Sequence, residues 1–243
     1  MRFPLALIGA LCTLLPPACF AEERGAARCA APPEIIADDP TLTAIGQDLH
    51  EHRPFVIVVI GGASTAGTAP DTSYPHFLEA ALRQRHPAQA ITVINRGVAG
   101  ETTQQMAARF PKDVYPDRPA LVIWETGTVD SVRGEDVDAV AGALTDGITA
   151  IRDHGAEAML VDMQYNPRTV SVINFEPYLA MLHQTADQQN VYMFKRFELM
   201  KYWSDAGAFD FTNVPREKRT TLARDLYECL GERLADAIDY AAR

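Results

Sequence analysis

A serine, a glycine and three carboxylates stand in short loops that each follow an apolar run. Ser64 lies in the segment GGASTAG, directly after the run FVIVVI, and Gly100 lies in a later loop. Glu125, Asp130 and Asp162 follow two further apolar runs. A serine attacks a carbonyl once a base takes its proton, and backbone N–H groups stabilise the resulting oxyanion. We therefore consider Ser64 a candidate nucleophile, with these carboxylates as candidate bases, and Gly100 a position where a ligand can approach the backbone closely.

The glycine-rich loop around Ser64 has other possible interpretations. A lysine does not follow its final glycine, and the G-x-G-x-x-G spacing is absent, so it is neither a phosphate loop nor a dinucleotide fingerprint. Its hydroxyl residues, Ser64 and Thr65, are also common helix N-caps. The sequence alone leaves open whether Ser64 is a nucleophile or whether Ser64 or Thr65 is a helix N-cap.

Five apolar, β-branched runs predict the strands that position these loops. Continuous runs of this kind are typical of strands buried on both faces of a parallel sheet. The predicted strands are 55–60, 91–94, 121–124, 158–161 and 191–194. The predicted helices are 41–51, 74–85, 102–110, 137–154, 176–188, 197–203 and 222–241.

Strands that alternate with helices predict a three-layer α/β/α fold of the flavodoxin-like kind, with a five-stranded parallel sheet. Ligands of such sheets bind beyond the carboxyl ends of the strands. The loops after the five strands should therefore meet at one edge and form a cleft. The candidates for lining it are Gly62, Ala63, Gly127, Val129, Asp130, Asp162 and Tyr165.

Three of these loops resemble the sequence blocks of the SGNH/GDSL ester hydrolases. The segment VIGGASTAG is similar to the family's nucleophile block, VINRGVAGET to its oxyanion-glycine block, and LVIWETGTVD to its Gly-x-Asn-Asp block. The resemblance extends from about Phe55 to the C-terminus. It implies an SGNH hydrolase fold, a small ester or acylated sugar as the ligand, and Gly100 as an oxyanion-hole residue.

Several residues differ from those that the resemblance would require. Ala63 stands where the family serine belongs, with Ser64 one residue later, and Val129 replaces the family asparagine. Lys218 and Thr221 stand at the positions of the Asp-His pair. Loss of a nucleophile or base typically lowers turnover by about a million-fold. We therefore expect weak or no esterase activity by the usual mechanism.

Three functions remain open from the sequence. A degenerate hydrolase would bind an ester, an acylated sugar or an envelope glycan without cleaving it. An active esterase would use Ser64 with a nonstandard base. A structural or partner-binding envelope protein would keep the cleft as a relic, closed by side chains such as Trp124 or Tyr165.

Charged residues and histidines near the loops are further binding candidates. Surface solvation is the more common role for each charged residue, although these side chains can recognise a carboxylate or sugar hydroxyls. They are Arg96, Glu101, Arg133 and Arg168. We expect His76 and His183 on solvated helix faces, and His50 and His52 at the far end of the first strand.

The overall charge argues against two classes of partner. The chain has 32 acidic and 22 basic side chains, which gives a formal net charge of −10. Because this charge repels phosphates and anionic lipid, we expect neither nucleic acid nor a membrane surface as a partner. No cofactor motif is visible, and neither Cys29 nor Cys229 has a Cys or His at metal-ligand spacing.

The N-terminus is typical of an export signal. Arg2 precedes the apolar run 5–15, and small residues follow up to Ala21, where we predict cleavage. This run is too short for a stable bilayer span. We therefore expect a periplasmic or secreted protein without stable membrane insertion after signal cleavage, and a lipid anchor on Cys19 stays open.

Export also bears on the two cysteines outside the predicted signal peptide, Cys29 and Cys229. In an oxidising compartment we favour a disulfide between Cys29 and Cys229 over two unrelated buried thiols. The predicted organisation is a signal peptide at 1–21, an N-terminal arm and short helix at 22–54, and an SGNH hydrolase-like domain at 55–243.

Overall fold

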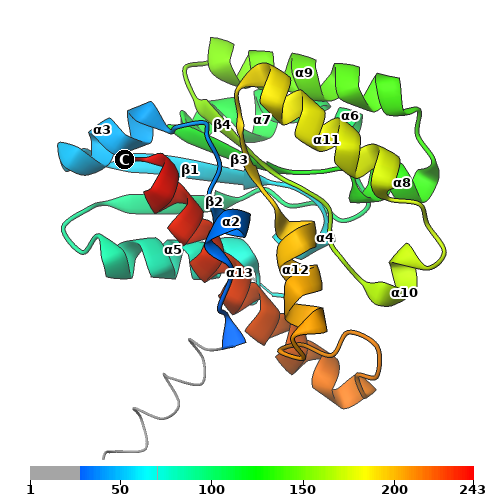
Figure 1. Ribbon diagram of the computed structural model, residues 1–243. Helices are drawn as coiled ribbons and strands as arrows, with labels where there is room; N and C mark the ends of the chain where they lie inside the picture. The colour runs from blue at the N-terminus through cyan, green and yellow to red at the C-terminus, as the bar shows by residue number, and fades with distance from the viewer. Residues whose placement is uncertain (1–27, 70) are drawn as a thin grey trace, which may run out of the picture.

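A five-stranded parallel sheet lies between two layers of helices (Figure 1). The computed structural model describes residues 28–69 and 71–243. The strands are β1 (Phe55–Ile60), β2 (Ile91–Asn95), β3 (Leu121–Glu125), β4 (Glu157–Val161) and β5 (Tyr192–Phe194), in the order β2-β1-β3-β4-β5. The predicted fold class is confirmed, and each strand end lies within about one residue of its predicted position.

The alternation of side chains along β1 explains why the sheet has two cores. Ile57 and Val59 pack into the core on one face, whereas Val58 and Ile60 pack into the core on the other. Successive residues of a strand point to opposite faces, so a strand covered on both sides must be apolar throughout. This is the reason for the unbroken run FVIVVI.

One helical layer contains the first described helices and the C-terminal helix, and the other contains the longest internal helices. The first layer consists of α2 (Pro33–Ile36), α3 (Thr43–His50), α5 (Tyr74–Arg85), α12 (Arg196–Asp205) and α13 (Arg219–Ala241). The second consists of α6 (Thr103–Ala108), α7 (Phe110–Asp113), α9 (Val137–Asp153) and α11 (Glu176–Gln189). Short helices in the loops are α4 (Ala63–Ala66), η1 (Tyr115–Asp117), α8 (Thr128–Arg133), α10 (Pro167–Val170) and η2 (Arg216–Lys218).

The predicted helix over 102–110 is wrong in its extent. The structure divides this region into α6, which ends at Ala108, and the separate helix α7, which begins at Phe110. Pro111 lies in the first turn of α7. A proline inside a continuous helix would remove a hydrogen bond and clash with the preceding turn, whereas the first turn of a new helix accepts it.

The N-terminal segment packs on the domain that follows it. Cys29 and Cys229 form a disulfide, with their Cα atoms 5.0 Å apart, which confirms the predicted pairing. Leu42 and Ile45, next to and within α3, belong to the same core as β1. The described part of the predicted arm is therefore tethered at both ends. The predicted signal peptide and residues 22–27 lie outside the described residues.

The strand order places the switch point between β1 and β3. From β1 the chain goes outward to β2, then returns past β1 to form β3 on its other side. In a sheet of order 2-1-3-4-5, ligands bind at this point beyond the strand ends. Ser64 follows β1 and Glu125 ends β3.

Among the described helices, none is long and apolar enough to cross a membrane.

Candidate functional site

The hydroxyl of Ser64 is engaged in three polar contacts at the switch point. Ser64 lies in α4 and is 5% exposed. Its Oγ donates to the Glu125 carboxylate, whose oxygens lie 2.9 and 2.8 Å away, and accepts an N–H from Arg196 at 2.9 Å. Gly62 precedes α4 at the N-cap position, so the alternative role of Ser64 or Thr65 as the N-cap is wrong.

Glu125 and Arg196 form a buried ion pair beneath Ser64. Glu125 is the last residue of β3 rather than a loop residue, and Arg196 is the first residue of α12. Arg196 Nη1 lies 3.2 Å from Glu125 Oε1, and the two side chains are 1% and 5% exposed. Thr65 also donates its hydroxyl to Glu125 Oε2. Each carboxylate oxygen therefore has two polar contacts within the protein.

Two tyrosines complete the surroundings of this ion pair. The Tyr74 hydroxyl lies 2.9 Å from the Thr65 hydroxyl. Burial, and then the charge of Glu125, raises the pKa of Tyr74, and the same two causes raise the pKa of Tyr227. Both phenols therefore stay neutral, and the buried cluster contains one positive and one negative charge.

Arg196 was not among the residues predicted from the sequence. It follows β5, so it belongs to one of the five loops that must meet at the sheet edge. Its Nη1 bonds to Ser64, but its Nε and Nη2 are buried without a hydrogen-bond partner among the described residues. The position of the strand end could have indicated this residue, but not that its side chain turns inward to pair with Glu125.

A small cavity opens beside Ser64. Its volume is about 100 Å³. Residues at or beyond the carboxyl ends of β1, β2, β3 and β4 line it, namely Gly62, Ala63, Ser64, Gly100, Glu101, Met106, Glu125, Thr126, Gly127, Thr128, Val129 and Gln164. The structure thus brings together Gly62, Ala63, Ser64, Gly100, Gly127 and Val129 of the predicted set.

Gly100 has the geometry of a ligand-facing glycine. Its φ is +83°, a value that favours glycine, and a Cβ there would meet nothing within 4 Å. Arg133 fixes its carbonyl with a hydrogen bond of 2.7 Å. Within the described residues its N–H has no acceptor. This N–H is therefore not used by the described part of the protein.

Asp130 holds two loops together and does not contact Ser64. Its carboxylate accepts from the Thr103 N–H at 3.0 and 3.2 Å and from the Thr103 hydroxyl at 3.0 Å. The Thr103 hydroxyl also lies 2.6 Å from that of Thr126. Asp130 is 2% exposed. The hypothesis that it acts as the base for Ser64 is not supported by this arrangement.

Asp162 is committed to His183, which corrects the expectation for that histidine. Asp162 Oδ2 lies 2.9 Å from His183 Nε2, and Asp162 Oδ1 accepts from the Phe197 N–H at 2.7 Å. The His183 side chain is 38% exposed, so it is half-buried rather than on a solvated face. Its hydrogen bond with Asp162 is the main cause of the raised pKa of His183. Asp162 is therefore not a base for Ser64 either.

The remaining loop candidates have partners within the protein. The predicted cleft-lining role of Tyr165 is wrong for the cavity at Ser64, because its ring packs edge-on against Phe197 at 5.2 Å. Trp124 is buried and likewise does not close this cavity. The charged residues Arg96, Glu101 and Arg168 contact Asp117, Arg109 and the Thr212 carbonyl respectively.

The positions of the family's Asp-His pair lie elsewhere. Lys218 and Thr221 line a separate surface pocket with Asp225. Among the hydrogen bonds of the described residues, none joins a histidine to Ser64 or Glu125. His76 is exposed, as expected, and His50 and His52 lie just before the start of β1, at the end expected for them.

A family model matches nearly all the described chain, and two curated relatives each match about half of it. The model of the Non-GDSL lipase-like family matches residues 28–243. An arylesterase of Vibrio mimicus is 31% identical over 113 residues, which are 46% of this chain and 56% of that protein. The esterase TesA of Pseudomonas aeruginosa is 26% identical over 122 residues, which are 49% of this chain and 61% of that protein. The matches thus span little more than half the length of these curated relatives.

Solved structures of ester hydrolases have the same fold. A lipolytic protein of the G-D-S-L family from Desulfitobacterium hafniense has a TM-score of 0.59 at 18% identity, covering 75% of this chain and 99% of its own. An acetylxylan esterase from Geobacillus stearothermophilus has a TM-score of 0.58 at 18% identity, covering 76% and 94%. At these identities the likeness establishes the fold alone.

Proposed function

The chain belongs to the Non-GDSL lipase-like family, within the SGNH/GDSL hydrolase-like group, and from this premise we propose that it binds a small acylated ligand without cleaving it. The ligand is an ester, an acylated sugar or an acylated envelope glycan. The observation that carries the proposal is the buried contact of Ser64 with Glu125 and Arg196.

The contacts of Ser64 oppose nucleophilic attack. A hydroxyl has one proton and two lone pairs. In Ser64 the proton points to Glu125, and Arg196 occupies one lone pair. If Glu125 accepted this proton, it would give up the charge that pairs with buried Arg196, and an unpaired buried charge is strongly destabilising. A carboxylate is also a weaker base for serine than histidine near neutral pH.

The cavity has the size and polarity for an acyl group. A water molecule takes about 30 Å³ in the liquid, so the volume of 100 Å³ corresponds to roughly three waters. An acetyl group fits such a space. The free N–H of Gly100 offers a donor to the carbonyl oxygen. The rest of the ligand would lie outside the cavity.

We also propose that the protein is exported to the periplasm or the medium. The N-terminal sequence supports this proposal, and the disulfide between Cys29 and Cys229 is compatible with it because disulfides persist in oxidising compartments. No nucleic acid partner is proposed, in keeping with the net charge of −10.

Binding is tested with an acetylated sugar and two variants on the same helix. The probe is glucose pentaacetate, and glucose is its unacetylated control. Binding of each sugar is detected by saturation-transfer NMR. Val129→Phe fills the cavity, whereas Val132→Phe adds the same ring to an exposed position of α8. We expect the acetyl methyl groups to receive saturation in the wild type and in Val132→Phe, but not in Val129→Phe. Equal signals in all three folded proteins would overturn the proposal.

A second candidate function is ester hydrolysis that uses Ser64 with Glu125. It is favoured by the distance of 2.8 Å between Ser64 Oγ and Glu125 Oε2 and by the nearby Gly100 N–H. Turnover of a short aryl ester that disappears in Ser64→Ala would establish this function in place of binding alone.

A further inference from the structure

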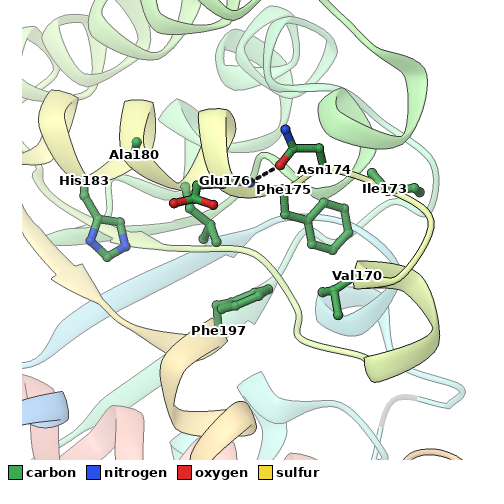
Figure 2. Close-up of a pocket in the computed structure, with 9 residues that line it drawn as sticks. Val170, Ile173, Asn174, Phe175, Glu176, Ala180, His183 and Phe197 are labelled. Atoms are coloured by element: carbon green, nitrogen blue, oxygen red, sulfur yellow. Dashed lines mark hydrogen bonds between the residues drawn. The ribbon is translucent and has the colours of Figure 1, made fainter.

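A second and larger pocket lies on the helical layer next to α11 and has no part in the proposed acyl site. Its volume is about 540 Å³, within the usual range for small-molecule sites. Figure 2 shows that its wall comes from α10, α11 and α12 and the segment between α10 and α11. Most of the lining is apolar, and the nine residues are Val170, Ile173, Asn174, Phe175, Glu176, Leu179, Ala180, His183 and Phe197.

Aromatic rings form part of the apolar wall. Phe175 and Phe197 lie edge to face, with ring centroids 6.2 Å apart. Phe175 is 3% exposed, whereas Phe197 is half-buried and leaves part of its ring accessible. In the view of Figure 2 the Phe197 ring lies between His183 and the Phe175 ring. A ligand with an apolar body is the type that such a surface accepts.

His183 supplies a fixed hydrogen-bond donor at the other side of the pocket. Its Nε2 is held by Asp162, whose side chain is 1% exposed and also accepts the Phe197 N–H. The described residues offer no partner to its Nδ1. The hydrogen bond with Asp162 favours the protonated ring, in which both nitrogens donate. When the ring is protonated, its Nδ1–H is a donor without a partner among the described residues, and it selects an acceptor, most strongly an anionic one.

The other charges near His183 determine how strongly an anion would be held. Asp162 and Asp187 raise the pKa of His183, whereas Lys195 lowers it. The positive charge of Lys195 therefore opposes the negative charge of Asp187. Glu176 lines the pocket seven residues before His183 on α11, which is about 10 Å along the helix axis. It is exposed, so water and salt weaken its repulsion of an anion at His183.

We propose that this pocket binds a small apolar carboxylate, with its carboxylate at His183 Nδ1 and its apolar body against Phe197 and Phe175. The protein's net charge of −10 disfavours nonspecific uptake of anions, so saturable binding of a carboxylate would report a local site. The site is separate from the cavity at Ser64, and none of its lining residues is shared with that cavity.

The test uses 1-naphthoate as the probe and 1-naphthalenemethanol as its uncharged match, with dissociation constants from calorimetry. Ala180→Trp fills the pocket from an exposed position, and Ala80→Trp is a matched control on an exposed position of α5. His183→Gln removes the charge but keeps an amide donor for Asp162. Thermal unfolding of each variant shows whether it is folded.

We expect naphthoate to bind more tightly than the alcohol, and His183→Gln to weaken it by on the order of tenfold. Ala180→Trp abolishes binding, and Ala80→Trp leaves it unchanged. Raising the pH through the pKa of His183 weakens naphthoate binding in the wild type but not in His183→Gln. Equal binding of the alcohol and the acid, no effect of His183→Gln, or no saturable binding to the folded protein would each overturn the proposal. Val129→Phe leaves naphthoate binding intact, which separates this result from the acyl-site test.

Discussion

The ion pair of Glu125 and Arg196 makes a sharp prediction because both side chains are almost fully buried. Arg196→Met removes one charge and leaves Glu125, which is 5% exposed, without a counterion. Removal of one partner from a buried pair typically costs about 3–5 kcal/mol. For a chain of this size, each kcal/mol lowers the midpoint of thermal unfolding by about 2–4 °C, so the expected loss is roughly 6–20 °C.

The assay is a double-mutant cycle with Arg196→Met, Glu125→Gln and the double variant, measured by urea unfolding. Glutamine still accepts from Ser64 and Thr65, so the double variant keeps those hydrogen bonds and has no unpaired buried charge. We expect each single variant to lose stability and the double variant to be more stable than Arg196→Met alone. Losses below about 1 kcal/mol for the single variants, or strictly additive losses, would refute the reasoning.

Three further predictions concern the disulfide, His183 and the approach of two loops. Reduction of the disulfide, or Cys29→Ala with Cys229→Ala, lowers the unfolding free energy by about 2–5 kcal/mol, because the disulfide connects residues 200 apart in sequence; an unchanged urea midpoint would contradict this. Because the pKa of His183 is raised in the folded state, its pairing with Asp162 adds stability below the unfolded pKa of about 6.5, and this contribution is lost as the pH rises through the folded value. The stability difference between wild type and His183→Gln should therefore shrink from about pH 6 to pH 9, and a constant difference would exclude the linkage. Gly97→Ala places a Cβ 2.2 Å from the Ala66 nitrogen and should cost about 1–3 kcal/mol, whereas Gly142→Ala in α9, with nothing within 4 Å, should be neutral or stabilising in the same unfolding assay.

The sequence was sufficient to predict the sheet because burial on both faces leaves a strong local signal. The run from Phe55 to Ile60 is apolar throughout, and the structure has β1 over the same residues. The loops after each strand were likewise sufficient to predict that Ser64, Gly100 and Val129 share a cavity. Both inferences rest on rules that hold for parallel sheets in general.

The contacts inside the site depend on side-chain directions that the sequence does not encode locally. Glu125, Asp130 and Asp162 were equivalent candidates as partners of Ser64, yet the end of β3 directs Glu125 inward whereas Asp130 turns to Thr103. Arg196 reaches Ser64 across 132 positions of sequence. His183 looked solvated because its pairing with Asp162 is also long-range, over 21 positions.

Hydrolysis of 4-nitrophenyl acetate by the purified protein, measured beside Ser64→Ala, distinguishes a site that only binds from one that also cleaves. Circular dichroism and the intact disulfide establish that both proteins are folded. We predict that the wild type releases nitrophenol no faster than Ser64→Ala. Catalytic turnover in the wild type that is lost in Ser64→Ala would contradict it and would make Ser64 a nucleophile.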